Sequence, residues 1–223
     1  MFFDTFMGGI DAVLHPDKVT KGAKTVGEAL LLYYNFSVIP LILLAIVALG
    51  AGFFLGGVIA AMGLVHSVFT GSLALLAVAG VIVYVWGLVP LGLLVSALIL
   101  HYVGRGLNLF KVGDYSSTFT AVVYSAMGPL SVLWLSVLPV VGGVVQLIAF
   151  VWSIYVLVAV LANVHKGTRV STFVAVLGGA LAAWLIVAVV AQLFAIGLFG
   201  TLVGPLIGVW SHFTSGGLMN STV

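Results

Sequence analysis

The sequence predicts an all-α integral membrane protein with five transmembrane helices, and three observations lead to that prediction. The chain of 223 residues is 63% hydrophobic and 5% charged, whereas soluble domains carry about 25% charged residues. Two long stretches, 29–104 and 115–164, contain no Asp, Glu, Lys or Arg. The seven Lys and Arg residues fall in three short clusters. Bilayer is the solvent that suits such a chain, so its length is best counted in crossings of ~20 residues.

Residues 1–28 are the most polar part and are expected to form a cytoplasmic or interfacial amphipathic segment. Apolar side chains recur there at helical spacing, and Pro16 should end the helix, because the residue before a proline avoids the α region. Lys18, Lys21 and Lys24 follow at intervals of three and would lie along one helix face. A solvated face is the simpler interpretation. Contact with anionic lipid is the alternative, at about 1 kcal/mol per lysine, which describes a weak anchor.

The five-helix transmembrane domain is expected over residues 29–200. At about 1.5 Å per residue, the stretch 29–104 is too long for one crossing of a ~30 Å hydrocarbon core. A glycine-rich connection over 55–72 should divide it. The second helix is long and contains Pro90, so either tilt or a kink at this proline should fit it to the bilayer. The expected helices are about 29–54, 73–103, 117–137, 144–164 and 170–198. The remainder, 201–223, is an outer apolar segment and tail, in which 201–213 is either a short interfacial helix or a sixth crossing.

The positions of the basic residues predict the threading. Lys and Arg in short loops stay cytoplasmic. All seven lie within 18–24, 105–111 and 166–169, so these clusters should share the inner side. An even number of crossings must then separate each pair, which gives two in 29–104 and two in 115–165. One further crossing places the N-terminus in the cytoplasm and the C-terminus outside. The stretch 115–164 is thus expected to be a helical hairpin with both ends on the inner side.

No catalytic, cofactor or metal site is predicted. The expected helix cores carry no ionisable group of the kind that ion-coupled transporters use, which leaves a passive pore possible. The chain has no cysteine, and HExxH and GxSxG motifs are absent. No pair among the five histidines has metal-ligand spacing, and interfacial hydrogen bonding is expected of them. The threading places three inside and two outside: His15, His101 and His165, then His66 and His212. Among helix amides, an unpaired Gln146 or Gln192 would be costly in lipid.

Two groups of residues are candidate contact sites. Seven basic side chains are candidates for weak contact with lipid headgroups: Lys18, Lys21, Lys24, Arg105, Lys111, Lys166 and Arg169. Small residues at intervals of four let helices approach closely, and they favour packing within the chain or, alternatively, self-association. The helix-packing candidates, with the helix-interior proline, are Gly52, Gly56, Pro129, Ala175, Gly179 and Ala183.

Three stretches together resemble the Yip1 family of multi-pass membrane proteins, in its prokaryotic form. The first runs from Leu14-His15-Pro16 to Tyr33-Tyr34-Asn35-Phe36. The second is 120–125 with Pro129, which is similar to a tyrosine–serine–proline pattern in the family's third helix. The third is 152–171, with its short basic turn. The resemblance implies five helices with a cytoplasmic N-terminus. Eukaryotic relatives are tied to small Rab-type GTPases and vesicle budding. Their long cytoplasmic N-terminal region has no counterpart in this sequence, so GTPase binding is not expected from the resemblance.

The expected function is that of a non-enzymatic, Yip1-type protein of the cell membrane. Membrane organisation, or partner binding in a trafficking-like role, is the first expectation. A passive channel or small-solute facilitator is one alternative, and an accessory subunit of a larger membrane complex is another. The expected partners are the lipid bilayer and either a second copy of the chain or other membrane proteins. No nucleic-acid surface is predicted, because aromatic and basic residues do not interleave on any segment.

Overall fold

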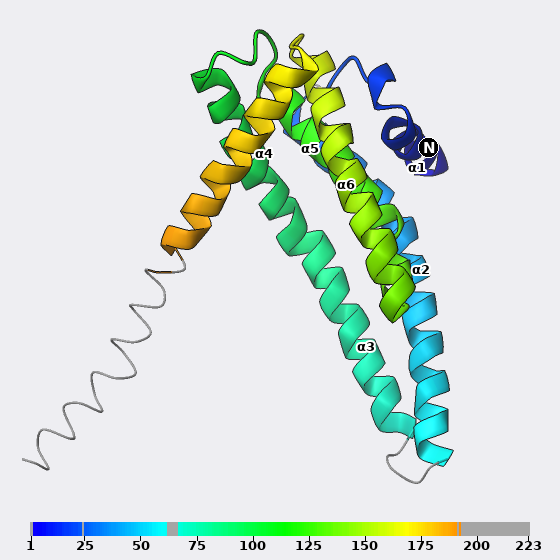
Figure 1. Cartoon of the computed structure of the whole chain (residues 1–223). Helices are drawn as coiled ribbons and strands as arrows, with labels where there is room; N and C mark the ends of the chain where they lie inside the picture. Colours follow the sequence, from blue (N-terminus) through cyan, green and yellow to red (C-terminus); the bar gives the residue numbers. More distant parts are fainter. Residues whose placement is uncertain (1, 24, 62–66, 191, 193–223) are drawn as a thin grey trace, which may run out of the picture. The chain divides into compact units, whose positions relative to one another are not determined.

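A computed structural model describes residues 2–23, 25–61, 67–190 and 192, and these residues form helices joined by short loops (Figure 1). The helices are α1 (Phe2–Leu14), α2 (Val26–Ala61), α3 (Ser67–Val83), α4 (Val89–Gly106), α5 (Tyr115–Ser131) and α6 (Pro139–Val164). A π-helical segment, η2 (Tyr84–Leu88), connects α3 to α4. Two short 3₁₀ helices are η1 (Pro16–Lys18) and η3 (Leu133–Val137). A last helix covers Arg169–Val190.

Four of the described helices are long and apolar enough to cross a membrane. They are Val26–Phe54, Leu75–Gly106, Val140–Val164 and Arg169–Val190. The described residues are therefore helical apart from short loops, as predicted, and four of their helices are compatible with an integral membrane protein. The chain divides into two units, residues 1–179 and 180–223. In the second unit the structure describes the helical residues 180–190 and 192. The expected helix end at 198 and the segment 201–213 lie outside the described residues.

The 17-residue helix α5, which is not among these four, is the centre of the first unit. It packs against α1, α2, α4 and α6. Most of its side chains are buried, including Phe119, Val123 and Met127. Asp114 begins the helix as a capping residue, because its carboxylate accepts hydrogen bonds from the backbone N–H of Ser117 at 3.0 Å and from its hydroxyl at 2.7 Å. The expected helix 117–137 is therefore shorter than predicted, and η3 forms its last part.

The hairpin expected at 115–164 is present as α5, η3 and α6. Pro139 opens α6 in its first turn, where a missing N–H costs no hydrogen bond. After α6, Lys166 adopts a left-handed conformation (φ 50°), and the N–H of Gly167 reaches back to the carbonyl of Ala162. This turn returns the chain sharply into the helix Arg169–Val190.

The glycine-rich connection predicted at 55–72 is wrong in extent. The helix α2 continues to Ala61 and α3 begins at Ser67, so at most 62–66 can connect them, and these residues lie outside the described part. Glycine costs a helix only about 1 kcal/mol per residue. An open backbone in lipid costs several kcal/mol per unpaired group, so an apolar glycine-rich segment stays helical.

The predicted effect of Pro90 takes the form of a π-helical segment. Proline has no N–H, so it cannot bond the carbonyl four residues earlier, which is that of Trp86. That carbonyl accepts a hydrogen bond from the Tyr34 hydroxyl at 3.2 Å, and Tyr33 donates to the neighbouring Val85 carbonyl at 2.6 Å. Two adjacent tyrosines of α2 thereby donate hydrogen bonds to helix carbonyls next to Pro90, and they fix α2 against η2.

Candidate membrane-surface site

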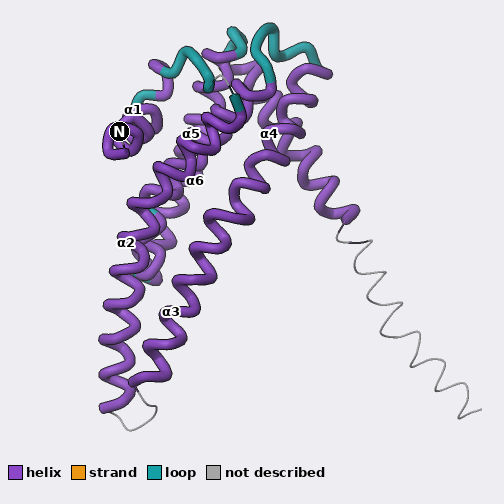
Figure 2. The backbone as a smooth tube through the Cα atoms, turned by 180° about the vertical axis from the view of Figure 1, so that it is seen from behind, coloured by secondary structure: helices purple, strands orange, loops and turns teal. Residues whose placement is uncertain are grey.

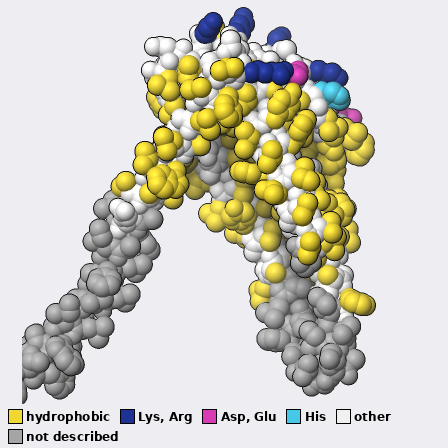
Figure 3. Space-filling model, in the orientation of Figure 1, with side chains coloured by type: hydrophobic (Ala, Val, Ile, Leu, Met, Phe, Trp, Pro, Cys, Tyr) yellow, Lys and Arg dark blue, Asp and Glu magenta, His cyan; other side chains and the backbone are white. Residues whose placement is uncertain are grey.

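The described basic residues gather at one end of the first unit, above flanks that are largely hydrophobic (Figure 3). They come from all three sequence clusters, and the loops that carry these clusters lie at the same end (Figure 2). The Arg169 guanidinium donates to the Asp17 carboxylate. This ion pair joins the basic cluster 166–169 to the start of the segment that carries Lys18 and Lys21. The basic residues of this end are Lys18, Lys21, Arg105, Lys111, Lys166 and Arg169. Lys24 lies outside the described residues.

A buried histidine joins the elements of this basic end. The His165 side chain is fully buried, and its ring stacks on Phe110 with 4.1 Å between ring centroids. Its Nδ1 contacts the carbonyl oxygen of Val112, which can only accept, so Nδ1 carries a proton. In the neutral ring Nε2 then accepts from the Thr118 hydroxyl at 2.9 Å. Since that hydroxyl has one proton, its oxygen accepts from Nδ1 of His101 at 2.8 Å.

The hydrogen bonds from His101 through Thr118 to His165 hold α4, α5 and the turn after α6 together. Both Thr118 and His165 are wholly enclosed. Gly113 (φ 94°) passes so close that a Cβ there would lie 2.5 Å from Nδ1 of His165. Burial lowers the pKa of His165, so the neutral ring is the favoured form. The Ser117 hydrogen bonds lower the pKa of Asp114 and keep the α5 cap ionised.

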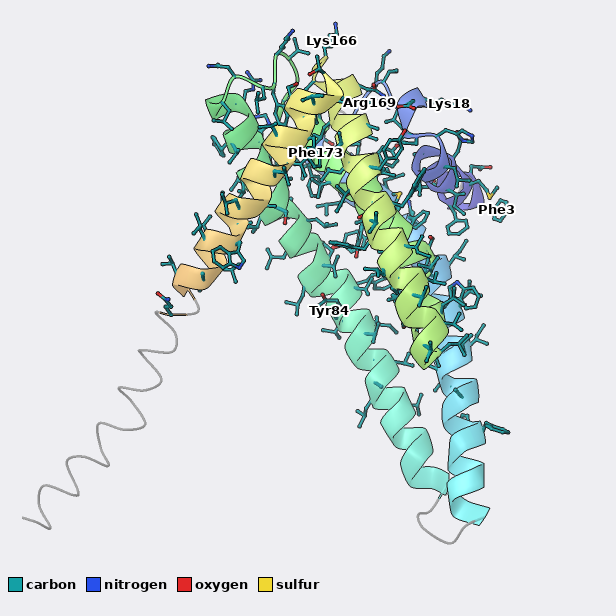
Figure 4. The ribbon with its side chains drawn as sticks, in the orientation of Figure 1. Phe3, Lys18, Tyr84, Lys166, Arg169 and Phe173 are labelled. Atoms are coloured by element: carbon teal, nitrogen blue, oxygen red, sulfur yellow. The ribbon has the colours of Figure 1, made fainter. Side chains whose placement is uncertain are left out.

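The end of α1 and the segment after it are fixed to α6 by side chains of that helix. Trp152 donates its indole N–H to the Val13 carbonyl at 2.9 Å. The Asn163 amide donates to the carbonyls of Pro16 and Asp17, at 3.3 and 3.1 Å. The Arg169 guanidinium lies 5.9 Å from the centre of the Tyr155 ring, so it stacks beside the same region. Figure 4 shows Lys18, Lys166 and Arg169 at this end of the structure.

Residues 19–23 form an irregular segment that is held against α5, and not the helix that was expected to align Lys18, Lys21 and Lys24. The helical turn η1 ends at Lys18. Beyond it, the N–H of Ala23 donates to the Thr120 hydroxyl at 3.0 Å, and the Ser116 hydroxyl donates to the Ala23 carbonyl at 2.7 Å. These two hydroxyls of α5 form the hydrogen bonds that the N–H and carbonyl of Ala23 would otherwise make within a helix. Sequence periodicity does not reveal such contacts, and it therefore misplaced the lysines.

The amphipathic helix α1 is packed across the bundle. It is seen nearly end-on in Figure 1, where α2 and α6 run lengthwise in the plane of the picture. Phe6 stacks on Phe36 with centroids 5.0 Å apart, and Gly9 is so close to that ring that a Cβ would lie 2.6 Å from it. Other apolar side chains of α1 face away from the bundle and are exposed: Phe3, Met7 and Leu14.

Two cavities lie beside these elements. A polar pocket of about 320 Å³ forms between α1, the following segment and α5, where Asp11, His15, Lys18, Lys21 and Tyr124 line it. An apolar groove of about 470 Å³ lies between η2, α5 and α6. Ser125 and Ser153 in this groove donate to backbone carbonyls, and the Gln146 amide donates to the Pro129 carbonyl at 3.3 Å. Tyr84 is a further polar side chain of the groove. The described residues contain no group of three His, Asp or Glu side chains that could hold a metal ion.

The helix-packing candidates fall in different surroundings. Ala175 is fully buried, and a Cβ on Gly179 would lie 3.1 Å from a Leu100 side-chain atom, so the last helix approaches α4 closely there. Pro129 lines the apolar groove. Gly52 is half-buried in α2, Gly56 continues that helix, and Ala183 belongs to the second unit. Of the amides singled out, Gln146 is bonded and Gln192 is exposed. His66 and His212 lie outside the described residues.

Sequence reasoning found the basic residues of this end but missed its buried polar core and the polar pocket. One available signal was that Ser116, Thr118 and Thr120 recur at every second position of an apolar helix, directly after the capping Asp114. The pocket left no such signal, because α1 and α5 are more than 100 residues apart in the chain. No family model, curated protein or solved structure matches this chain.

Proposed function

We propose that this chain is a non-enzymatic, multi-pass protein of the cell membrane, of Yip1 type, that organises the bilayer through its N-terminal helix. Five helices cross the membrane, with α5 and η3 completing the third crossing. The N-terminus is cytoplasmic and the C-terminus lies outside. The grouping of the three basic clusters at one end supports this threading, since basic loops remain cytoplasmic.

The observation that carries the proposal is an amphipathic helix held rigidly across a membrane-sized bundle. An amphipathic helix that lies in the headgroup layer inserts its apolar side chains among the acyl chains. In α1 those side chains are Phe3, Met7 and Leu14, which are 65%, 48% and 60% exposed. The contacts of Trp152, Asn163 and Gly9 hold α1 against the bundle. The helix therefore adds volume to one leaflet next to a fixed membrane anchor, which favours curvature of that leaflet.

Reconstitution of the full chain into liposomes tests this function. Vesicle diameter, measured by electron cryomicroscopy, should fall as the protein-to-lipid ratio rises. The triple variant F3A/M7A/L14A should lose most of that effect, because it removes the exposed apolar face of α1. The control L76A/L91A/V95A removes three exposed apolar side chains from α3 and α4 and should behave like the wild type. Equal effects of the two triple variants, or no remodelling by the wild type, would overturn the proposal.

The same liposomes distinguish the other roles. Solute flux without remodelling would favour a passive facilitator, and remodelling only after a second protein is added would favour an accessory subunit. The apolar groove gives little support to a solute path, since its serines and Gln146 are bonded to backbone carbonyls. Self-association, measured by cross-linking in the liposomes, would identify a second copy of the chain as the partner.

A further inference from the structure

The polar pocket beside α1 has the charge and the free hydrogen-bonding groups of an anion site. Lys18 and Lys21 line it, and neither forms an ion pair with a described carboxylate. Tyr124 lines it from α5, and its hydroxyl bonds no described residue. No buried side-chain oxygen or nitrogen among the described residues lacks a partner, so the Tyr124 hydroxyl must be accessible. Two lysines and a tyrosine with an accessible hydroxyl thus line one cavity.

A carboxylate on the same cavity limits the charge of the anion that fits. Asp11 lines the pocket, and its carboxylate accepts a hydrogen bond from Nδ1 of His15 at 2.9 Å. Two lysines and one aspartate give the cavity a formal net charge of +1. A phosphodiester, with one negative charge, balances this site better than a phosphate dianion. Asp11 also offers an acceptor to an ammonium or hydroxyl group carried by the same ligand.

The pocket has fixed walls. One wall is α1, which Gly9 and Phe6 hold against Phe36. The other is the segment 15–21, which continues into Ala23 and its two hydrogen bonds to α5. Preformed walls lower the entropy that a ligand must remove on binding. A cavity of about 320 Å³ is at the lower end of the range for small-molecule sites, and it is sufficient for a headgroup without its acyl chains.

We propose that this pocket binds the headgroup of a phospholipid. Lys18 and Lys21 pair with the phosphodiester oxygens, the Tyr124 hydroxyl donates to one of them, and Asp11 accepts from an ammonium or hydroxyl group of the headgroup. The choice of a lipid over a soluble phosphate rests on the proposed function. The exposed apolar side chains of α1 place the pocket at headgroup depth, where the acyl chains of the ligand can remain in the bilayer.

Native mass spectrometry of the full chain, released from detergent and titrated with phosphatidylethanolamine, phosphatidylglycerol or phosphatidylcholine, tests the proposal. The first two lipids should show one tight site, and phosphatidylcholine, whose headgroup has no donor, should bind less tightly. K18Q/K21Q should weaken that site about tenfold or more, because hydrogen bonds to charged groups are lost. Y124F, which removes a single hydroxyl, should weaken it about threefold or more without lowering thermal stability. K111Q/K166Q is the matched control and should bind within about twofold of the wild type.

Two results would overturn the proposal. Equal weakening by K18Q/K21Q and K111Q/K166Q would mean that lipid is attracted by the general charge of this end and not by the pocket. Displacement of the lipid by an equimolar amount of glycerol phosphate or inorganic phosphate would assign the site to a soluble phosphate. The F3A/M7A/L14A variant separates this proposal from the preceding one, because it should retain the lipid site even where vesicle remodelling is lost.

Discussion

At the scale of single residues, His165 is the side chain on which the basic end depends most. Its ring bonds the loop before α5 through Val112, bonds α5 through Thr118, and stacks on Phe110. A neutral ring can form both hydrogen bonds, because it donates to the Val112 carbonyl and accepts from the Thr118 hydroxyl. The expectation of hydrogen bonding for the histidines therefore describes His165, but its complete burial could not be read from the sequence. A histidine beside Lys166 in a basic turn is usually exposed.

The stability of the protein should depend on pH through His165. Burial lowers its pKa in the folded chain, so between the folded and unfolded pKa values the unfolded state binds more protons. The contribution is fully present above the ordinary histidine pKa of about 6.5 and is lost as pH falls below it. The ionisable groups that face the ring are His101, Arg105 and Asp114, of which Asp114 favours the charged form and the other two oppose it.

Thermal unfolding in detergent, followed by tryptophan fluorescence, measures this dependence. The apparent Tm should be nearly constant above pH 7.5 and should decrease as pH falls from about 6.5. H165Q should be less stable at neutral pH but should show a weaker pH dependence. H15Q, which removes an exposed histidine, is the comparison variant. An unchanged profile in H165Q would show that another group carries the titration.

At the scale of elements, the segment 19–23 determines where α1 and the lysines lie. Periodicity correctly indicated an amphipathic helix ending at Pro16, since α1 ends at Leu14. It then failed at the lysines, because the deciding hydrogen bonds come from Ser116 and Thr120, almost 100 residues later. The predicted helix boundaries near 55–72 were wrong for a different reason. Glycine signals a turn in water, whereas the bilayer favours continued helix.

Gly22→Ala tests the attachment of this segment to α5. A Cβ at Gly22 would lie 2.8 Å from the Cα of Ser117, so the backbone must move and the two hydrogen bonds of Ala23 should weaken. We expect a loss of stability of about 1–3 kcal/mol and faster proteolysis within residues 15–25. Gly27→Ala is the matched control, since its nearest atom is a flexible Thr25 oxygen at 3.8 Å. If both variants resist protease like the wild type, the segment is not held by these contacts.

At the scale of the whole molecule, charge distribution was the most informative feature of the sequence. The three basic clusters do meet at one end of the first unit, although they are separated by long uncharged stretches. The helical hairpin at 115–164 was predictable for the same reason. The central position of α5 was not, because its Ser and Thr residues lower its hydropathy, and they are buried by contacts with α1, α4 and α6 that sequence patterns do not encode.

The central claim is that the basic end faces the cytoplasm and that α5 and η3 cross the bilayer. The chain has no cysteine, so single cysteines can be introduced and labelled with a membrane-impermeant maleimide in right-side-out and inside-out vesicles. We expect K21C, K111C and V170C to react only from the cytoplasmic side. L138C, at the turn between η3 and α6, and T222C should react only from the outside. Labelling of L138C from the same side as K111C, or of K111C and V170C from opposite sides, would contradict the account.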